Sequence, residues 1–275
     1  MRTQMQKAEI FRALHERPGA FIIPNPWDAG TAKLLGAMGF EALATTSLGL
    51  ANMLGSATVT TAAIIENCRI IAEASELPVS VDLENGGADD PQTAAEAIRL
   101  AAEAGAVGGS IEDASGDARR PIYDFALAVE RVQAAVEAAR SLPIPFTLTA
   151  RAENLLYGRN DLDDTIGRLQ GFEAAGADVL YAPGVRDLPT IRTVVSAVKK
   201  PFNLVMGFAD PTLTLEQLSA AGVKRISVGG ALSRVALAAF LRCAREMKDN
   251  GSFTYVRKMT PIKDLREAFA SVTPP

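Results

Sequence analysis

The stretch Pro78-Val-Ser-Val-Asp-Leu-Glu-Asn-Gly-Gly-Ala-Asp-Asp90 begins with the pattern of a β-strand, and that pattern ends abruptly within it. Residues 79–82 favour a buried β-strand, and the Gly86-Gly87 pair breaks that pattern a few residues later. Asp82 and Glu84 lie two positions apart, so in a continuous strand their side chains point to the same side. Two carboxylates held together at the end of a buried strand are costly without a counter-charge. This strand end is therefore a candidate functional site.

Similar strand-like runs recur along the chain, and each is followed by a helical pattern. The eight runs are residues 21–24, 41–46, 79–82, 108–112, 146–151, 178–182, 202–206 and 225–229. Ala-rich amphipathic segments such as 91–104, 125–139 and 163–174 separate them, and several helical patterns end in Gly, namely at Gly39, Gly105, Gly176 and Gly222. Glycine at this position accepts the left-handed conformation that closes a helix. Eight βα units in about 250 residues predict an α/β fold, specifically a (β/α)8 TIM-type barrel.

The end of the chain differs from these units. Residues 252–259 show little helical periodicity, and residues 261–270 form a further amphipathic pattern after the eighth unit is complete. We predict one barrel domain over residues 1–275, with 252–275 as a C-terminal extension. An extension of this kind usually caps the barrel or reaches a neighbouring subunit. We therefore expect a homo-oligomer, either a dimer or a tetramer.

Composition narrows the class of protein. The chain has 275 residues, of which 48% are hydrophobic, and 28 basic against 32 acidic residues give a net charge of -4. No cationic block suits nucleic acid, and no apolar run reaches the roughly 18 residues that span a membrane. The N-terminus lacks the apolar core of a signal peptide, so a cytoplasmic location is expected. His15 is the only histidine, which argues against a His-dependent triad or a multi-histidine zinc site.

Polar residues gather at the C-terminal ends of the predicted strands, where active sites of such barrels lie. They are Asn25 and Asp28, Asp82 and Glu84, Glu112 and Asp113, and Thr149, Arg151 and Glu153. Converging carboxylates repel one another unless a cation lies among them, and all-oxygen ligands select Mg²⁺ or Mn²⁺. The alternative is that Arg151 only neutralises Asp82 or Glu112 in a network of ion pairs. One arginine, however, does not balance so many acids.

Three motifs on the third, fourth and fifth predicted strands resemble the phosphoenolpyruvate mutase and isocitrate lyase superfamily. They are Asp82-Leu-Glu84-Asn-Gly86-Gly87, Ser110-Ile-Glu112-Asp113 and Thr149-Ala-Arg151-Ala-Glu153-Asn154. The resemblance implies an α/β barrel, often tetrameric with the last helix exchanged between subunits, that binds magnesium and a small anionic 2-oxo or enol acid. It implies that Asp82 is the direct metal ligand, that Glu84 and Glu112 hold metal-bound waters, and that Arg151 pairs with the substrate carboxylate or phosphonate.

The resemblance also suggests which residues contact the substrate. Residues 45–49 correspond to the stretch whose backbone amides grip it, and Asn154 and Tyr181 are placed to line the same mouth. The candidate sites are thus Arg151 and Glu112 for catalysis, Asp82, Glu84 and Glu112 for the metal, and Thr46, Ser47, Leu48, Arg151, Asn154 and Tyr181 for substrate binding. As alternatives, Thr46 and Ser47 are plain strand residues with satisfied hydroxyls, and Tyr181 serves packing.

The sequence departs from the family pattern in the loop after the fourth strand. Isocitrate and methylisocitrate lyases carry a Lys-Lys-Cys-Gly-His type loop there, whereas residues 113–124 contain neither Cys nor His. Classical isocitrate lyase activity is therefore not expected. Thr58 stands where the phosphonomutases keep an acidic residue, and Glu84 replaces their common Asp.

These features together predict a magnesium-dependent lyase. It would cleave a C–C bond next to the carbonyl of a small 2-oxo or 2-hydroxy di- or tricarboxylate through an enolate, as an oxaloacetate decarboxylase or substituted-malate lyase does. Decarboxylation needs no thiol, since solvent can protonate the enolate. Two alternatives stay open: a P–C bond enzyme such as a phosphoenolpyruvate mutase or phosphonopyruvate hydrolase, and a catalytically silent barrel that binds a metabolite.

Overall fold

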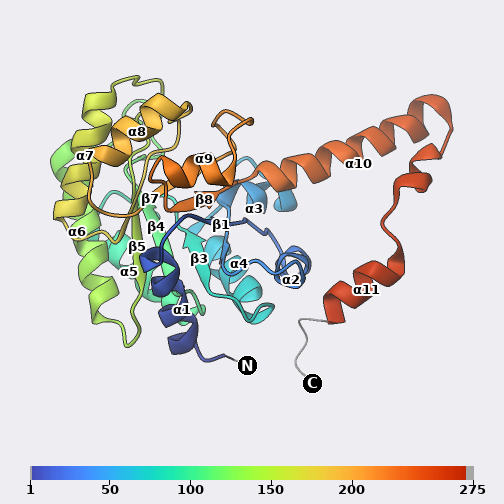
Figure 1. The fold of residues 1–275 in the computed structure, drawn as a ribbon, viewed down its shortest axis with the longest axis horizontal. Helices are drawn as coiled ribbons and strands as arrows, with labels where there is room; N and C mark the ends of the chain where they lie inside the picture. The colour runs from blue at the N-terminus through green and yellow to red at the C-terminus, as the bar shows by residue number, and fades with distance from the viewer. Residues whose placement is uncertain (1, 271–275) are drawn as a thin grey trace.

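A computed structural model describes residues 2–270 and contains one sheet of eight parallel strands (Figure 1). The strands are β1 (Phe21–Ile23), β2 (Leu43–Ala44), β3 (Val79–Asp82), β4 (Gly108–Glu112), β5 (Thr147–Arg151), β6 (Val179–Tyr181), β7 (Phe202–Val205) and β8 (Arg225–Ser227). Their order is β1-β8-β7-β6-β5-β4-β3-β2. The amide of Ala44 donates to the carbonyl of Pro24 at 3.1 Å, which links the two outer strands. The sheet thus forms a nearly closed barrel, and the predicted (β/α)8 fold is confirmed.

Helices alternate with the strands as the sequence predicts. They are α1 (Gln4–Glu16), α2 (Ala29–Ala37), α3 (Ser47–Leu54), α4 (Thr61–Glu73), α5 (Pro91–Glu103), α6 (Phe125–Ser141), α7 (Leu162–Ala174), α8 (Leu188–Ser196), α9 (Leu215–Ala220) and α10 (Ala231–Asn250), followed by η1 (Thr254–Lys258) and α11 (Ile262–Ala270). Asp or Thr side chains accept hydrogen bonds from the first turns of α1 to α5 and α7 to α9, which fixes where these helices begin. Asp28 is one of these caps, so it does not belong to the carboxylates expected at the strand ends.

The inside of the barrel is unusually polar. Apolar residues such as Val81 and Leu148 point outward and pack with Ile71 of α4 and Ile98 of α5. The alternate positions of the strands carry Ser80, Ser110, Asn203, Arg225 and Ser227, which are buried and line a cavity. Because side chains alternate along a strand, the apolar core lies between strands and helices, and a polar cavity occupies the barrel axis.

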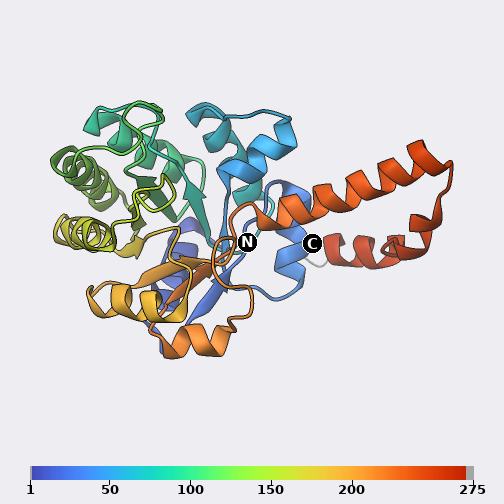
Figure 2. The same ribbon diagram turned by 90° about the horizontal axis from the view of Figure 1, so that it is seen from above.

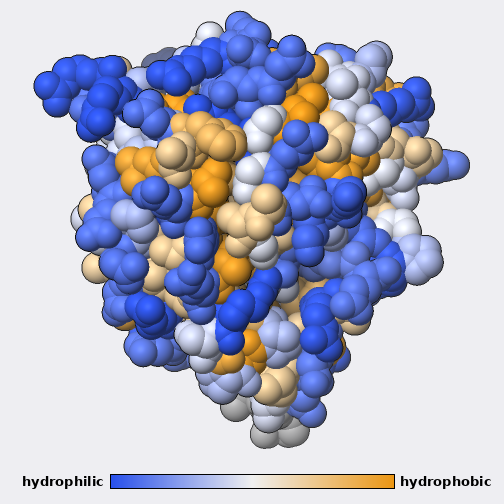
Figure 3. Space-filling view, turned by 90° about the vertical axis from the view of Figure 1, so that its left-hand side faces the viewer, coloured by the Kyte–Doolittle hydropathy of each residue, from blue (hydrophilic) through white to orange (hydrophobic). Residues whose placement is uncertain are grey.

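The last two helices form an arm that extends beyond the barrel. Helix α10 begins against α3 and then leaves the barrel, and α11 turns back to lie beside α2 (Figures 1 and 2). The arm exposes large apolar side chains, including Val235, Phe240 and Ile262. On the opposite side, where α6 and α7 lie, hydrophilic residues cover most of the surface and apolar residues form only separate patches (Figure 3). The predicted helix at 261–270 is confirmed as α11, and residues 271–275 of the predicted extension lie outside the described part of the chain.

No helix within residues 2–270 is long and apolar enough to cross a membrane.

Candidate active site

A cavity opens at the C-terminal ends of the strands and runs down the barrel axis. It measures about 790 Å³ including its open entrance. We call Asp82, Glu84, Glu112, Arg151 and Glu153 the mouth, because they lie at or just beyond the strand ends. We call Thr149, Asn203, Arg225 and Ser227 the floor. Thr149 lies two positions before Arg151 on β5. Arg225 lies two positions before Ser227 on β8.

Arg151 is the centre of the mouth. Its Nη1 lies 2.6 Å from Asp82 Oδ1, and its Nη2 lies 3.0 Å from Glu112 Oε2 and 2.8 Å from Glu153 Oε1. The ring of Tyr181 lies 4.9 Å from the guanidinium carbon, in a cation–π contact. Burial disfavours the charged form of Arg151, but the neighbouring carboxylates outweigh it and raise its pKa well above the usual value. The network of ion pairs considered from the sequence is therefore present.

Asp82 connects Arg151 to the start of α3. Its Oδ2 accepts hydrogen bonds from the amide of Ser47 at 3.1 Å and from the Ser47 hydroxyl at 3.0 Å. Thr46 caps the same helix by accepting from the amide of Gly49 at 3.2 Å, and Leu48 lines the cavity beside them. The first turn of α3 thus faces the strand end that carries Asp82. That the backbone amides of residues 45–49 grip the substrate stays a prediction.

The other acids of the mouth carry more negative charge than Arg151 can offset. Burial raises the pKa of Glu112, and the charges of Glu153, Asp82 and Glu84 raise it further, against the opposing effect of Arg151. Burial, and then the charge of Asp82, raise the pKa of Glu84. Both carboxyls are thus raised first by burial and then by the negative charges close to them.

Glu84 reaches the mouth by a route that the strand pattern did not predict. Strand β3 ends at Asp82, and Glu84 has a φ of 51°, the only positive φ of a residue other than glycine among residues 2–270. The alternation of side chains in a strand therefore does not explain why Asp82 and Glu84 lie together, and that reasoning is wrong. A left-handed turn at Glu84, followed by Gly86 at φ 80° and Gly87 at φ 112°, directs the chain away from the barrel.

The oxygen donors of the mouth fit a hydrated divalent cation. Residues 2–270 hold no group of three or more His, Cys, Asp or Glu side chains that could bind one metal ion directly. Mg²⁺ is usually held by one or two carboxylates and keeps several waters, so it does not need such a group. Asp82 as a direct ligand, with Glu84 and Glu112 acting through water, meets this requirement, and the excess negative charge favours a cation.

The floor has the opposite character. Arg225 Nε donates to Asn203 Oδ1 at 2.7 Å, and its Nη2 donates to Thr149 Oγ1 at 2.9 Å. Asn203 Nδ2 donates in turn to Ser227 Oγ at 3.1 Å. Burial lowers the pKa of Arg225 to about 10, with a contribution from Arg151, so Arg225 is still charged at neutral pH.

Comparison with known proteins decides the family. The model of the phosphoenolpyruvate phosphomutase family matches residues 11–248, which is most of the chain. The chain belongs to the phosphoenolpyruvate mutase and isocitrate lyase superfamily. It is 30% identical to the 2-methylisocitrate lyase of Escherichia coli strain K12 over 78% of this chain and 75% of that one. It is 28% identical to the oxaloacetate decarboxylase of Bradyrhizobium diazoefficiens strain USDA 110, over 82% and 78% of the two chains.

A solved structure is more similar still. A Burkholderia cenocepacia J2315 protein, named only by class as a lyase/mutase, is 59% identical, with a TM-score of 0.95 over 97% of this chain and 96% of that chain. The predicted superfamily is confirmed, and with it the prediction that the chain is an enzyme of that superfamily.

Asn154, one of the predicted substrate-binding residues, lies outside the cavity. Asn154 is fully buried, and its side-chain amide donates to Thr165 Oγ1 at 2.8 Å and to the carbonyl of Asp161 at 3.2 Å. It fastens the segment after β5 to the start of α7 and does not line the cavity. Its prediction as a substrate contact is wrong, because its hydrogen bonds are already used within the protein. Tyr181, in contrast, lines the cavity.

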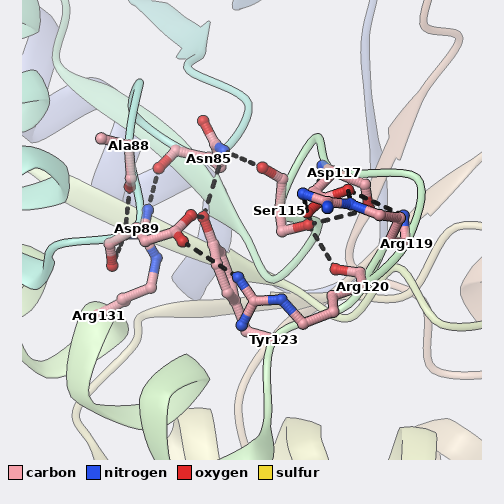
Figure 4. A network of polar contacts seen from close by, with 9 residues as sticks. All are labelled: Asn85, Ala88, Asp89, Ser115, Asp117, Arg119, Arg120, Tyr123 and Arg131. Carbon is pink, nitrogen blue, oxygen red and sulfur yellow. Dashed lines mark hydrogen bonds and ion pairs between the residues drawn. The ribbon is translucent and has the colours of Figure 1, made fainter.

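The loop of residues 113–124 is fastened to the turn that follows Glu84 (Figure 4). Asn85 Nδ2 donates to the carbonyl of Ser115 at 3.1 Å, and the Tyr123 hydroxyl donates to Asp89 Oδ1 at 2.8 Å. Arg119 is exposed and pairs with Asp117 of the same loop, and Arg120 lies 3.8 Å from Asp89. Arg119 and Arg120 thus lie against acids of the two loops, and neither lines the cavity.

The sequence patterns do not predict the floor. They place Arg225, Asn203 and Ser227 only within strands, although the sequence carries a signal for a further role. Arg225 and Ser227 occupy alternate positions of an otherwise apolar strand, and a charged residue there must face either the barrel axis or the helices.

Proposed function

We propose that this protein is a Mg²⁺- or Mn²⁺-dependent lyase that cleaves a C–C bond beside the carbonyl of a small 2-oxo or 2-hydroxy di- or tricarboxylate, through an enolate. An oxaloacetate decarboxylase or a substituted-malate lyase has this chemistry. The observation that carries the proposal is the position of Asp82, held between Ser47 and Arg151 and surrounded by further carboxylates. The likeness to a 2-methylisocitrate lyase and an oxaloacetate decarboxylase supports it.

A divalent cation beside Asp82 would supply a Lewis acid for the substrate's oxygen atoms. The residues of the chain bind and orient the substrate. Arg151 offers a planar pair of donors that matches a carboxylate, which a lysine does not reproduce. The first turn of α3 adds the backbone N–H of Leu48, which has no partner within the helix, whereas the N–H of Ser47 already donates to Asp82.

Glu112 is the candidate to carry a proton. Burial and the neighbouring acids raise its pKa, which brings the carboxyl closer to the range where an acid can hold and release a proton near neutral pH. Residues 113–124 supply neither a thiol nor an imidazole for this purpose. The proposal therefore favours reactions in which Glu112 or solvent protonates the product.

An assay of the purified protein tests the proposal. With Mg²⁺ present, oxaloacetate or a substituted malate should be turned over, and chelation of the metal should abolish turnover. Turnover of phosphonopyruvate without turnover of any 2-oxo or 2-hydroxy acid would overturn the proposal in favour of P–C bond chemistry, the alternative that the name of the matching family suggests.

Calorimetry with oxalate, an enolate mimic, separates an enzyme from a silent barrel. Oxalate should bind only when Mg²⁺ is present, and the Asp82→Ala variant should lose this binding. Binding that is the same with and without Mg²⁺ would favour a barrel that only stores or senses a metabolite.

We also propose that the protein forms a homo-oligomer through the arm of α10, η1 and α11. The exposed apolar residues of the arm, such as Val235 and Phe240, support this assignment because exposed apolar patches of this kind mark interfaces. Light scattering should give the mass of a dimer or tetramer, and Phe240→Ser should shift it toward the monomer. A monomeric wild-type protein would contradict the assignment.

A further inference from the structure

Among residues 2–270, Arg131, Arg168 and Arg225 are buried and Arg151 is mostly so, and of these Arg225 has no acidic group beside it. Arg151 pairs with the acids of the mouth, and Arg168 pairs with Asp113 and Asp164. Arg131 forms no ion pair among residues 2–270, but it donates to the carbonyls of residues 88–90 and lies near the charges of Asp89 and Asp90. Arg225 forms no ion pair with any carboxylate in the part of the chain that the structure describes. A buried charge without a counter-charge is strongly unfavourable, so its persistence here needs an explanation.

The contacts of Arg225 leave one donor atom unused. Its side chain is almost entirely buried, with 5% of the residue exposed. Asn203 and Thr149, its two hydrogen-bond partners, are both neutral, and its Nη1 has no partner among residues 2–270. The neutral partners orient the guanidinium without offsetting its charge. The missing partner should therefore be an acceptor, and a negative one is favoured.

The cavity gives such an acceptor access to Arg225. Arg225, Asn203 and Ser227 all line the same cavity that reaches Asp82 and Arg151 at the mouth. Ser227 Oγ accepts a hydrogen bond from Asn203, which leaves its own hydroxyl hydrogen available to donate. A water molecule at this position would satisfy a hydrogen bond but would not supply the missing negative charge.

We propose that the floor is an anion-binding subsite, in which Arg225 and Ser227 hold a carboxylate-sized anionic group. The subsite itself does not depend on the proposed function, but the assignment of the anion to the substrate rests on it. A substrate carboxylate remote from Asp82 is the favoured source, because one continuous cavity joins mouth and floor. The other source is a small free anion. The subsite would select substrates with a second acidic group over those with one.

Anomalous diffraction with bromide tests the subsite itself. Crystals grown with sodium bromide in place of chloride should show an anomalous peak within hydrogen-bond distance of Arg225 Nη1. The peak should be absent from the Arg225→Met variant. A water molecule, with no bromide, beside Nη1 in the wild-type crystals would overturn the subsite.

Binding in solution supplies the second readout. Without divalent cation, so that no turnover is expected, formate should raise the melting temperature of the wild-type protein, whereas neutral formamide should not. Arg225→Met should weaken formate binding by about tenfold or more, and Arg17→Met, which removes an exposed arginine, should leave it unchanged. If Arg225→Met does not fold, Ser227→Ala should weaken formate binding while it keeps the charge. Equal formate binding in wild type and Ser227→Ala or Arg225→Met would overturn the proposal.

Competition identifies the source of the anion. If a substrate carboxylate fills the floor, bromide should weaken the binding of oxaloacetate but not that of pyruvate, which has a single carboxylate. An equal effect on both would overturn the assignment to the substrate and leave the free anion as the occupant. Because these measurements need no catalysis, they remain valid if the assay for lyase activity fails.

Discussion

The mouth and the floor of one cavity carry opposite charge. At the mouth, Arg151 lies among Asp82, Glu84, Glu112 and Glu153, and burial, together with the charges of the neighbouring acids, raises the pKa of Glu112. At the floor, Arg225 has only neutral hydrogen-bond partners. The charge of the mouth thus favours a cation, and that of the floor favours an anion. A metal complex of a small polycarboxylate would satisfy both, which connects the fold to the kind of ligand that we propose.

The largest expected effect comes from removing the positive charge of the mouth. Arg151→Met should lower the free energy of unfolding by about 3–5 kcal/mol at pH 7, because it leaves several carboxylates buried and unpaired. Urea denaturation measures this loss. The matched control Arg17→Met breaks an exposed pair with Glu41 and should cost less than about 1 kcal/mol.

The pH dependence of the Arg151→Met variant checks the cause. Burial already raises the pKa of Glu112 and Glu153, and losing Arg151 should raise both further. A raised carboxyl pKa means that the folded state binds more protons than the unfolded state, so the variant should regain stability as the pH falls from 7 toward 5. A variant that loses stability over this range relative to wild type would contradict the description of the mouth.

The next effect is on catalysis. Asp82→Asn keeps the shape of the side chain and removes its charge, so activity with Mg²⁺ should fall by on the order of 10²–10³-fold. Stability should change much less than in Arg151→Met, because an acid is removed from a site with too many acids. Asp187→Asn is the matched control, since Asn caps a helix as well as Asp and residue 187 caps α8. Full activity of Asp82→Asn would show that the reaction does not depend on this carboxylate.

Much of the fold and of the mouth could be predicted from the sequence. The eight strands lie where the apolar runs predict them, and the helix-ending glycines Gly39, Gly105, Gly176 and Gly222 all have positive φ. Asp82, Glu112 and Arg151 are found together because the C-terminal ends of parallel strands meet at one end of a barrel. Local periodicity predicts the strands and helices, and the shared end of parallel strands predicts which of their residues meet.

The remaining features depend on contacts that periodicity does not encode. Glu84 has a left-handed backbone conformation, and the side chain of Asn154 forms hydrogen bonds with Thr165 and Asp161. Strand alternation predicts neither the direction of the Glu84 side chain nor that of Asn154. The floor joins Thr149 of β5, Asn203 of β7 and Arg225 of β8. Which strands face each other across the axis depends on how the barrel closes, and that is a property of the whole sheet.

A smaller effect is expected beneath the floor, at His15 of α1. Burial, helped by the charges of Arg225 and Lys224, lowers the pKa of His15 to about 3, although its bond to the carbonyl of Phe11 opposes this. The folded state therefore binds fewer protons here than the unfolded chain, whose histidine pKa is about 6.5, so stability is full above that pH and falls as the pH drops toward 3. The loss should reach about 2 kcal/mol at pH 5.

Comparison of wild type with His15→Gln isolates this contribution, because the carboxylates titrate in both proteins. The difference in the free energy of unfolding between pH 7 and pH 5 should be about 2 kcal/mol smaller in the variant. Parallel stability curves for the two proteins would mean that burial does not hold His15 neutral in the folded state.

The smallest effect is expected at Tyr181, which lies between the two regions. Its ring contacts Arg151, and it lines the cavity that also reaches Arg225. Tyr181→Phe keeps the ring, so the free energy of unfolding should change by no more than about 0.5 kcal/mol, whereas Tyr181→Ala should lose a further 0.5–1 kcal/mol or so from the cation–π contact. If the hydroxyl touches the substrate where it passes from mouth to floor, Tyr181→Phe should raise the KM for oxaloacetate more than it changes kcat. An unchanged KM would mean that the Tyr181 hydroxyl does not contact the substrate.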